Sequence, residues 1–167
     1  MSYLSTMDTP VGPFTMVADA DGAILASGFT DDIESLLTPV PVKFRTRPEP
    51  RRELGLATKA VAAYLEGDLT AIDAVPVRQR SGAFLTHAWD VLREVRPGAA
   101  ITYTEFAARA GRPAAVRAAA QACGRNAAAL FVPCHRILRL DGTLGGYRWG
   151  LPVKRWLLDH ELARNVA

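Results

Sequence analysis

A cysteine, a histidine and an arginine follow a proline without interruption in the stretch Val132-Pro133-Cys134-His135-Arg136. Proline fixes φ and removes a backbone donor, so it presents the next residues rigidly and outside a regular ladder. The thiolate is the reactive form of cysteine, and a neighbouring cation or imidazole lowers the pKa of the thiol. The stretch therefore predicts an activated nucleophile at Cys134. A buried, inert cysteine beside a surface His-Arg pair is the alternative that these residues alone leave open.

A carboxylate is the partner that orients such a histidine, and Glu161 is the candidate. The sequence predicts a helix from Pro152 onward, in which Leu157 and Leu158 lie four and three residues before Glu161. That spacing puts Glu161 over the apolar side of the helix, where a carboxylate requires a partner such as His135. A glutamate at the helix edge that reaches solvent remains the alternative.

The histidine next to the cysteine is expected to act through water. Adjacent residues in a strand or loop point apart, which favours a water relay between Cys134 and His135 over a direct hydrogen bond. His160 competes with His135 as the partner of Glu161, although packing beside Trp156 explains it better.

Short helices in the second half must position these residues. One helix is predicted over residues 84–95, and Thr102-x-x-Glu105 is a capping box that starts another, which ends at Gly111. Pro113 stands where a proline favours the start of a third helix, over residues 113–123. Two short helices joined by a three-residue turn with glycine resemble a helix-turn-helix.

The helix predicted over residues 113–123 has an outward face of alanines around one arginine. The residues expected to face the core, at i, i+3, i+4 and i+7, are Val116, Ala119, Ala120 and Cys123. The opposite side presents Ala114, Arg117, Ala118 and Gln121. Such a face can approach another surface closely, with Arg117 as a single probe. A helix of high propensity with a solvated arginine is the alternative.

Residues 1–80 contain no charge in a context that suggests chemistry. Strands are predicted over residues 3–8, 12–19, 22–29 and 71–77, and helices over 33–37 and from Leu54 to Gly67. Four prolines in residues 38–52 predict a long surface connection. We therefore expect an α+β fold: a small α/β support domain over residues 1–80, followed by a mostly helical domain with the helix-turn-helix over residues 81–167. In the latter, residues 137–147 are expected to form a tight hairpin or loop with a turn at Asp141-Gly142.

Composition limits the class of protein. The 167 residues are 49% apolar and 22% charged, as in an ordinary soluble globular protein. No apolar run reaches the roughly 18 residues that a membrane span needs, and no signal peptide is visible, so we expect a cytoplasmic protein without membrane contact. Two cysteines and three histidines without metal-ligand spacing predict no metal and reduced thiols.

The charge is unevenly placed along the chain. Residues 1–83 carry eight Lys and Arg against eleven Asp and Glu, whereas residues 84–167 carry twelve against six. A basic C-terminal half indicates an anionic partner, nucleic acid first. A solvated basic face is the alternative.

The combination resembles the O6-alkylguanine-DNA alkyltransferases, the single-turnover DNA repair proteins. The resemblance extends without a gap from about Phe84 to Glu161 and is more distant over Thr9-Pro10-Val11-Gly12-Pro13-Phe14. It rests on Thr102-Tyr103, Pro113-Ala114-Ala115-Val116-Arg117, Asn126, Pro133-Cys134-His135-Arg136, Gly142-Thr143-Leu144, Gly146-Tyr147, Lys154 and Leu157-Leu158-x-x-Glu161.

The resemblance implies a role for each catalytic residue. Cys134 is the alkyl acceptor, His135 acts as a base through a bound water, and Glu161 orients His135. Asn126 supports the active-site loop. No cofactor is expected, and each molecule acts once.

The same resemblance implies how a monomer binds its partner, double-stranded DNA with O6-alkylguanine, through the minor groove. Tyr103 hydrogen-bonds the extruded base and Arg117 fills the gap left in the duplex. Arg136, Tyr147 and Arg148 complete the expected contacts with DNA and substrate.

Departures from the family pattern and three rival functions remain. Tyr147-Arg148-Trp149-Gly150 is similar to the C-terminal domain of Ada-type proteins and gives the pocket a bulkier rim than the Tyr-Ser-Gly form. Ala127 stands where a proline is frequent, which predicts a looser hinge. The rivals are a helix-turn-helix regulator that reads the major groove, a non-catalytic binder of alkyl lesions, and a cysteine hydrolase. The presence of Cys134 argues against the lesion binder.

Overall fold

The computed structural model describes residues 1–164, and their contacts divide them into two units. Unit 1 comprises residues 1–80 together with 127–131, and unit 2 comprises residues 81–126 together with those from 132 onward. The α+β class predicted from the sequence is confirmed. No helix in the described part of the chain is both long enough and apolar enough to span a membrane.

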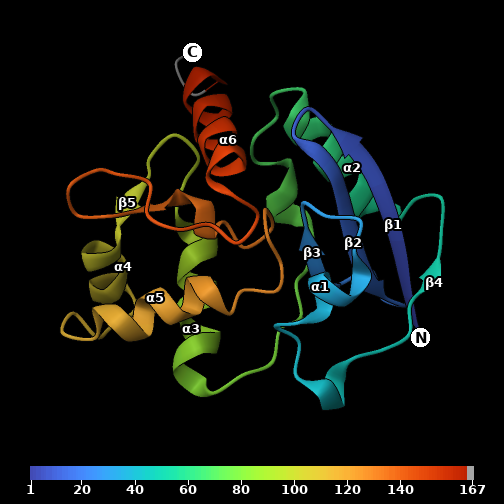
Figure 1. Cartoon of the computed structure of the whole chain (residues 1–167), viewed down its shortest axis with the longest axis horizontal. Helices are drawn as coiled ribbons and strands as arrows, with labels where there is room; N and C mark the ends of the chain where they lie inside the picture. Colours follow the sequence, from blue (N-terminus) through green and yellow to red (C-terminus); the bar gives the residue numbers. More distant parts are fainter. Residues whose placement is uncertain (165–167) are drawn as a thin grey trace. The chain divides into compact units, whose positions relative to one another are not determined.

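Unit 1 is built on a four-stranded sheet with the order β3-β2-β1-β4 (Figure 1). Its elements are β1 (Ser2–Thr9), β2 (Gly12–Asp19), β3 (Ile24–Gly28), α1 (Ile33–Leu37), the 3-10 helix η1 (Val42–Phe44), β4 (Glu49–Pro50), α2 (Leu56–Leu65) and the 3-10 helix η2 (Ala71–Ala74). The β1–β2 turn is closed by the Thr9 hydroxyl, which donates to the Gly12 carbonyl at 2.6 Å, and Gly12 adopts φ 106°. Residues 14–18 of β2 are all buried, so both faces of this strand are covered.

The strand predicted over residues 71–77 is wrong. Residues 71–74 form η2 instead, because amides there bond back to carbonyls three residues earlier, as Asp73 does to Thr70 at 3.0 Å. Only Val77 pairs with the sheet, in an isolated parallel bridge to Ile24. Pro76 lacks the amide that a longer ladder would need.

Unit 2 is mostly helical and carries the predicted helix-turn-helix as α4 and α5 (Figure 1). Its elements are α3 (Ala83–Glu94), β5 (Ile101–Thr102), α4 (Tyr103–Arg109), α5 (Val116–Gly124), the 3-10 helix η3 (Cys134–Arg136), β6 (Ile137–Leu138) and α6 (Leu151–Arg164). The Thr102 hydroxyl caps α4 by accepting from the Glu105 amide at 3.1 Å. The indole of Trp89 on α3 donates to the Ala122 carbonyl on α5 at 2.9 Å.

The start of α5 at Pro113 is wrong by three residues. The Ala115 amide bonds to the Arg112 carbonyl at 2.9 Å, which closes a turn with Pro113 as its second residue. Proline suits that position of a turn as well as it suits the first position of a helix. The buried side of α5 is Ala119 and Ala122, whereas Cys123 is only partly buried.

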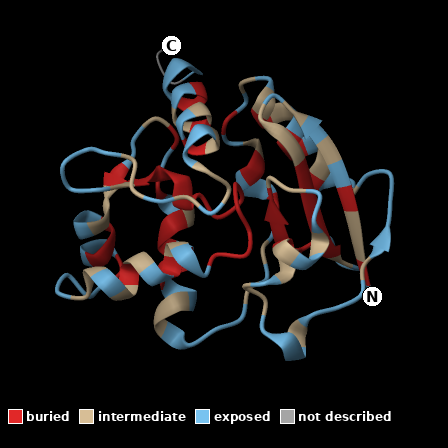
Figure 2. Ribbon diagram, in the orientation of Figure 1, coloured by how far each residue is buried: buried red, intermediate tan, exposed pale blue. Residues whose placement is uncertain are grey.

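The segment from Asn126 to Ile137 is continuously buried (Figure 2). Residues 127–131 belong to unit 1, where the Ser27 amide donates to the Ala127 carbonyl at 2.8 Å and the Ser27 hydroxyl to the Ala129 carbonyl at 2.8 Å. Leu130 adopts φ 74°, an unusual value for a residue with a side chain. The chain then returns to unit 2 at Val132, two residues before Cys134.

Candidate active site

Cys134 opens the 3-10 helix η3 directly after Pro133. The side-chain amide of Asn126 donates to the Val132 carbonyl at 2.8 Å, which holds the backbone just before this helix. Cys134 is buried, with 9% of its surface exposed. Asn126, which the resemblance named as the support of the active-site loop, therefore contacts the backbone two residues before Cys134.

The predicted direction of the Cys134 pKa is wrong. Burial raises the pKa of the Cys134 thiol above its ordinary value, and a hydrogen bond from Asn126 and the charge of Lys154 only partly oppose this. Cys134 is therefore a thiol at neutral pH. A base must remove its proton when it reacts.

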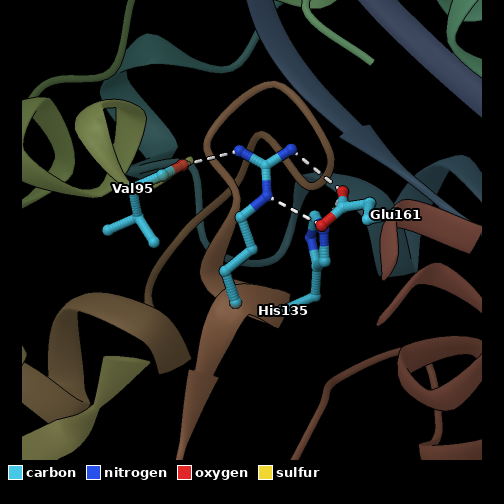
Figure 3. A network of polar contacts seen from close by, with 4 residues as sticks. Val95, His135 and Glu161 are labelled. Carbon is cyan, nitrogen blue, oxygen red and sulfur yellow. Dashed lines mark hydrogen bonds and ion pairs between the residues drawn. The ribbon is translucent and has the colours of Figure 1, made fainter. Parts of the chain in front are cut away.

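His135 has the electronic state that such a base requires. Its Nε2 lies 2.8 Å from Oε2 of Glu161, and both side chains are 0% exposed (Figure 3). Burial alone would raise the pKa of Glu161, but contacts with His135 and Arg136 hold it well below its usual range. Because a carboxylate only accepts, Nε2 carries the hydrogen and Nδ1 presents a lone pair. Within the described residues, Nδ1 is buried and has no hydrogen-bond partner.

Burial keeps His135 neutral, with help from nearby cations. Burial lowers the pKa of His135, the Glu161 carboxylate opposes this, and the charges of Arg136 and Lys154 lower the pKa further. A neutral imidazole with a bare Nδ1 can accept a proton.

Arg136 is not placed to contact DNA, so that prediction is corrected. Its side chain is almost wholly buried; Nε and Nη2 donate to the two oxygens of Glu161 at 2.9 Å each, and Nη1 donates to the Val95 carbonyl at 2.8 Å (Figure 3). A bidentate guanidinium–carboxylate pair satisfies both groups in the interior. The sequence placed a cation beside the cysteine, but it did not show that the cation turns inward.

Lys154 is a residue to which the sequence analysis assigned no role. Its side chain is 0% exposed, and Nζ donates to the carbonyls of Ile137, Leu144 and Gly146 at 2.7, 2.5 and 3.2 Å. It therefore joins both ends of the loop that follows the nucleophile. Lys154 shares the buried face of α6 with Glu161, seven residues later, so the spacing argument that found Glu161 also applied to Lys154.

The helix-turn-helix and the loop of residues 139–146 line a cavity of about 410 Å³ that is open to solvent. It is lined by Tyr103, Thr104, Val116, Arg117, Ala120, Arg139, Leu140, Gly145 and Gly146. Burial raises the pKa of Tyr103 to about 12, so its hydroxyl remains a donor at neutral pH. Arg117 is exposed on α5 at this cavity. The structure brings these two predicted residues together.

Tyr147 and Arg148 point to different surroundings. The hydroxyl of Tyr147 is buried without a hydrogen-bond partner in the described chain, and its ring meets His135 edge-on at 6.5 Å between centroids. Arg148 is exposed and lies over the Trp149 ring at 4.4 Å. Neither residue lines the cavity of Tyr103 and Arg117.

The residues described contain no group of three or more histidine, cysteine, aspartate or glutamate side chains that could hold a metal ion.

Comparison with known proteins identifies the family. Residues 83–163 match the model of the 6-O-methylguanine DNA methyltransferase, DNA binding domain. The methylated-DNA–protein-cysteine methyltransferase of Shigella flexneri is 32% identical over 157 residues, which cover 92% of this chain and 91% of the relative. The chain belongs to this methyltransferase family. The resemblance stated from the sequence is confirmed.

Two further methyltransferase matches each cover more than nine tenths of the chain. The methylated-DNA–protein-cysteine methyltransferase of Salmonella typhimurium is 35% identical over 160 residues, which cover 92% of this chain and 91% of the relative. A crystal structure of Mycobacterium tuberculosis OGT in complex with DNA superposes with a TM-score of 0.83 at 31% identity, over 97% of this chain and 94% of that one. Both units of this methyltransferase therefore have the architecture of the family.

Proposed function

We propose that this protein repairs O6-alkylguanine in double-stranded DNA by moving the alkyl group onto Cys134, once per molecule. The observation that carries the proposal is the buried Glu161–His135 pair, which leaves Nδ1 free to accept a proton in the residue that follows Cys134 in the chain. The relatives are named methylated-DNA–protein-cysteine methyltransferases, and one solved structure of the family contains DNA, which supports the choice of substrate.

The transfer begins with the thiol proton, which passes through a bridging water to Nδ1 of His135. The Cys134 thiolate then attacks the alkyl carbon, forming a C–S bond as the bond from that carbon to O6 breaks. The electron pair of that bond leaves with guanine, which takes up one proton at N1 from solvent, while the proton on Nδ1 of His135 returns to solvent. The products are guanine and an S-alkyl cysteine, and no cofactor enters this balance.

Tyr103, Asn126 and Arg117 support the transfer in this proposal. Tyr103 donates its hydroxyl hydrogen to the extruded base, because a phenol with a raised pKa stays protonated. Asn126 holds the Val132 carbonyl and so fixes the approach to Cys134. Arg117 enters the duplex where the base has left, and the small residues of α5 allow a monomer to bind in the minor groove.

Intact mass after incubation with a duplex that carries O6-methylguanine tests the proposal. The expected result is one added methyl group on Cys134, at most one event per molecule, and none in Cys134→Ser. Absence of a mass shift, or many turnovers per molecule, refutes the proposal. Sedimentation of the complex tests whether the protein binds DNA as a monomer. Competition with a ligand that occupies the minor groove tests whether the protein binds there.

A further inference from the structure

A second arginine, Arg139, lines the cavity of Tyr103 and Arg117, and the roles proposed above leave it unused. The cavity wall carries two arginines and no carboxylate among its nine residues. Unmodified DNA has negative charge only on its phosphates. A cavity with this charge therefore suits a phosphate at its mouth as well as a neutral base inside.

The backbone of Arg139 is held by the loop that carries it. The Arg139 amide donates to the Thr143 carbonyl at 3.0 Å, and its carbonyl accepts from the Gly142 amide at 2.9 Å. Asp141 accepts from the Thr143 amide and hydroxyl at 3.0 and 2.7 Å, and these bonds, with the charge of Arg139, lower the pKa of Asp141. In the described chain Arg139 is exposed and forms no ion pair.

The side chain of Arg139 meets Tyr103 at Gly145. A Cβ atom added to Gly145 would lie 3.4 Å from Arg139 Cγ and 3.4 Å from Tyr103 Cε2, so both side chains pack against this glycine. The charge of Arg139 also lowers the pKa of Tyr103, against the larger effect of burial. A cation thus stands beside the phenol that is proposed to bind the extruded base.

We propose that Arg139 binds a phosphate next to the extruded nucleotide and so holds that nucleotide in the cavity. Arg117 occupies the gap inside the duplex, which leaves Arg139 as the cavity cation available to the backbone. A guanidinium donates two parallel hydrogen bonds to a phosphate, and the loop fixes the backbone from which this one extends. This inference rests on the proposed function.

The test removes the Arg139 side chain and the charge of the phosphate, first singly and then together. Duplexes carry O6-methylguanine with either an ordinary backbone or one uncharged methylphosphonate, placed on the 5′ or the 3′ side of the lesion. Methyl transfer is measured at limiting DNA for the wild type, Arg139→Ala and Arg139→Lys. Arg155→Ala is the charge-matched control, because Arg155 is exposed on α6 and does not line the cavity.

With the ordinary backbone, Arg139→Ala is expected to slow transfer about 10-fold, as for a lost charged hydrogen bond. The slope of the logarithm of the transfer rate against the logarithm of salt concentration should become shallower by about one, as for the loss of one phosphate contact. Arg139→Lys should retain the salt dependence and part of the rate, and Arg155→Ala should match the wild type.

The methylphosphonate decides whether the arginine acts through a phosphate. At one of the two positions it should slow the wild type by a similar factor and leave Arg139→Ala no slower than on the ordinary duplex. Equal rates for Arg139→Ala and wild type, or equal slowing of both by each methylphosphonate, overturn the inference. Failure of the wild type to transfer methyl would instead refute the proposed function.

Discussion

Replacing Arg136 with methionine tests whether the buried charge network sets the state of His135. The substitution keeps an apolar stem and removes three hydrogen bonds, two to Glu161 and one to the Val95 carbonyl. Glu161, which is 0% exposed, is then left with His135 as its remaining partner in this network. The buried carboxylate thereby loses the cation that pairs with it.

The magnitude follows from the burial of both groups. Removing one partner of a buried ion pair destabilises a protein by about 3–5 kcal/mol, a large part of the roughly 5–15 kcal/mol that holds a domain folded. We expect Tm of Arg136→Met to fall by on the order of 10–20 °C. The loss of the cation also raises the pKa of His135, because Arg136 lowers that pKa in the wild type.

The assay is the pH dependence of methyl transfer, measured with thermal unfolding of the same samples. A protonated His135 cannot accept the thiol proton, so the acid limb of the rate profile should move to higher pH in Arg136→Met. The double variant Arg136→Met/Glu161→Gln removes both charges and should unfold at a higher temperature than the single variant. An unchanged Tm and an unchanged acid limb in Arg136→Met would refute the reasoning.

Two further predictions follow from Lys154 and from the buried titrating groups. Lys154→Met leaves three carbonyls without their donor, so we expect a loss of about 2 kcal/mol in urea unfolding and slower transfer; the exposed neighbour Arg155→Met is the control, and equal behaviour of the two variants would contradict a role for Lys154. Acid should destabilise the protein in two steps, because folding lowers the pKa of both His135 and Glu161. The unfolded chain binds the histidine proton first, so Tm should fall below about pH 6.5 and fall further below about pH 4.5. His135→Gln should lose the first step, and a flat Tm between pH 7 and 5 would contradict the assignment.

Local patterns predicted the elements that local forces determine. The strands over residues 12–19 and the capped helix α4 follow from turn glycines and from the hydroxyl of Thr102, which act within a few residues. The strand over residues 71–77 and the start at Pro113 failed because one pattern suits two structures: an apolar run forms a strand or a 3-10 helix, and a proline suits a helix start or a turn. The passage of residues 127–131 into unit 1 has no local signal, since its partner Ser27 is a hundred residues away.

The site divides in the same way. The helical spacing of Glu161 predicted a buried carboxylate and its contact with His135, because one face of a helix is readable from the sequence. The inward direction of the Arg136 side chain was missed because the sequence shows the charge but not the buried Glu161 carboxylate that pairs with it. The sign of the Cys134 pKa was missed for a related reason: neighbours along the chain argue for a lower value, whereas burial, a property of the whole fold, decides for a higher one.

A raised thiol pKa suits a nucleophile that each molecule uses once. A cysteine that rested as a thiolate would react with stray electrophiles and oxidants, and every such event would consume a molecule. Burial keeps Cys134 protonated, and in the proposed mechanism the neutral His135 accepts the proton when an alkyl carbon is in place. The ion pair of Arg136 and Glu161 maintains that readiness, because it orients the imidazole without charging it. The thiol therefore becomes reactive only when substrate is bound. Loss of the Arg136 cation should impair this step, because a protonated His135 cannot accept the thiol proton.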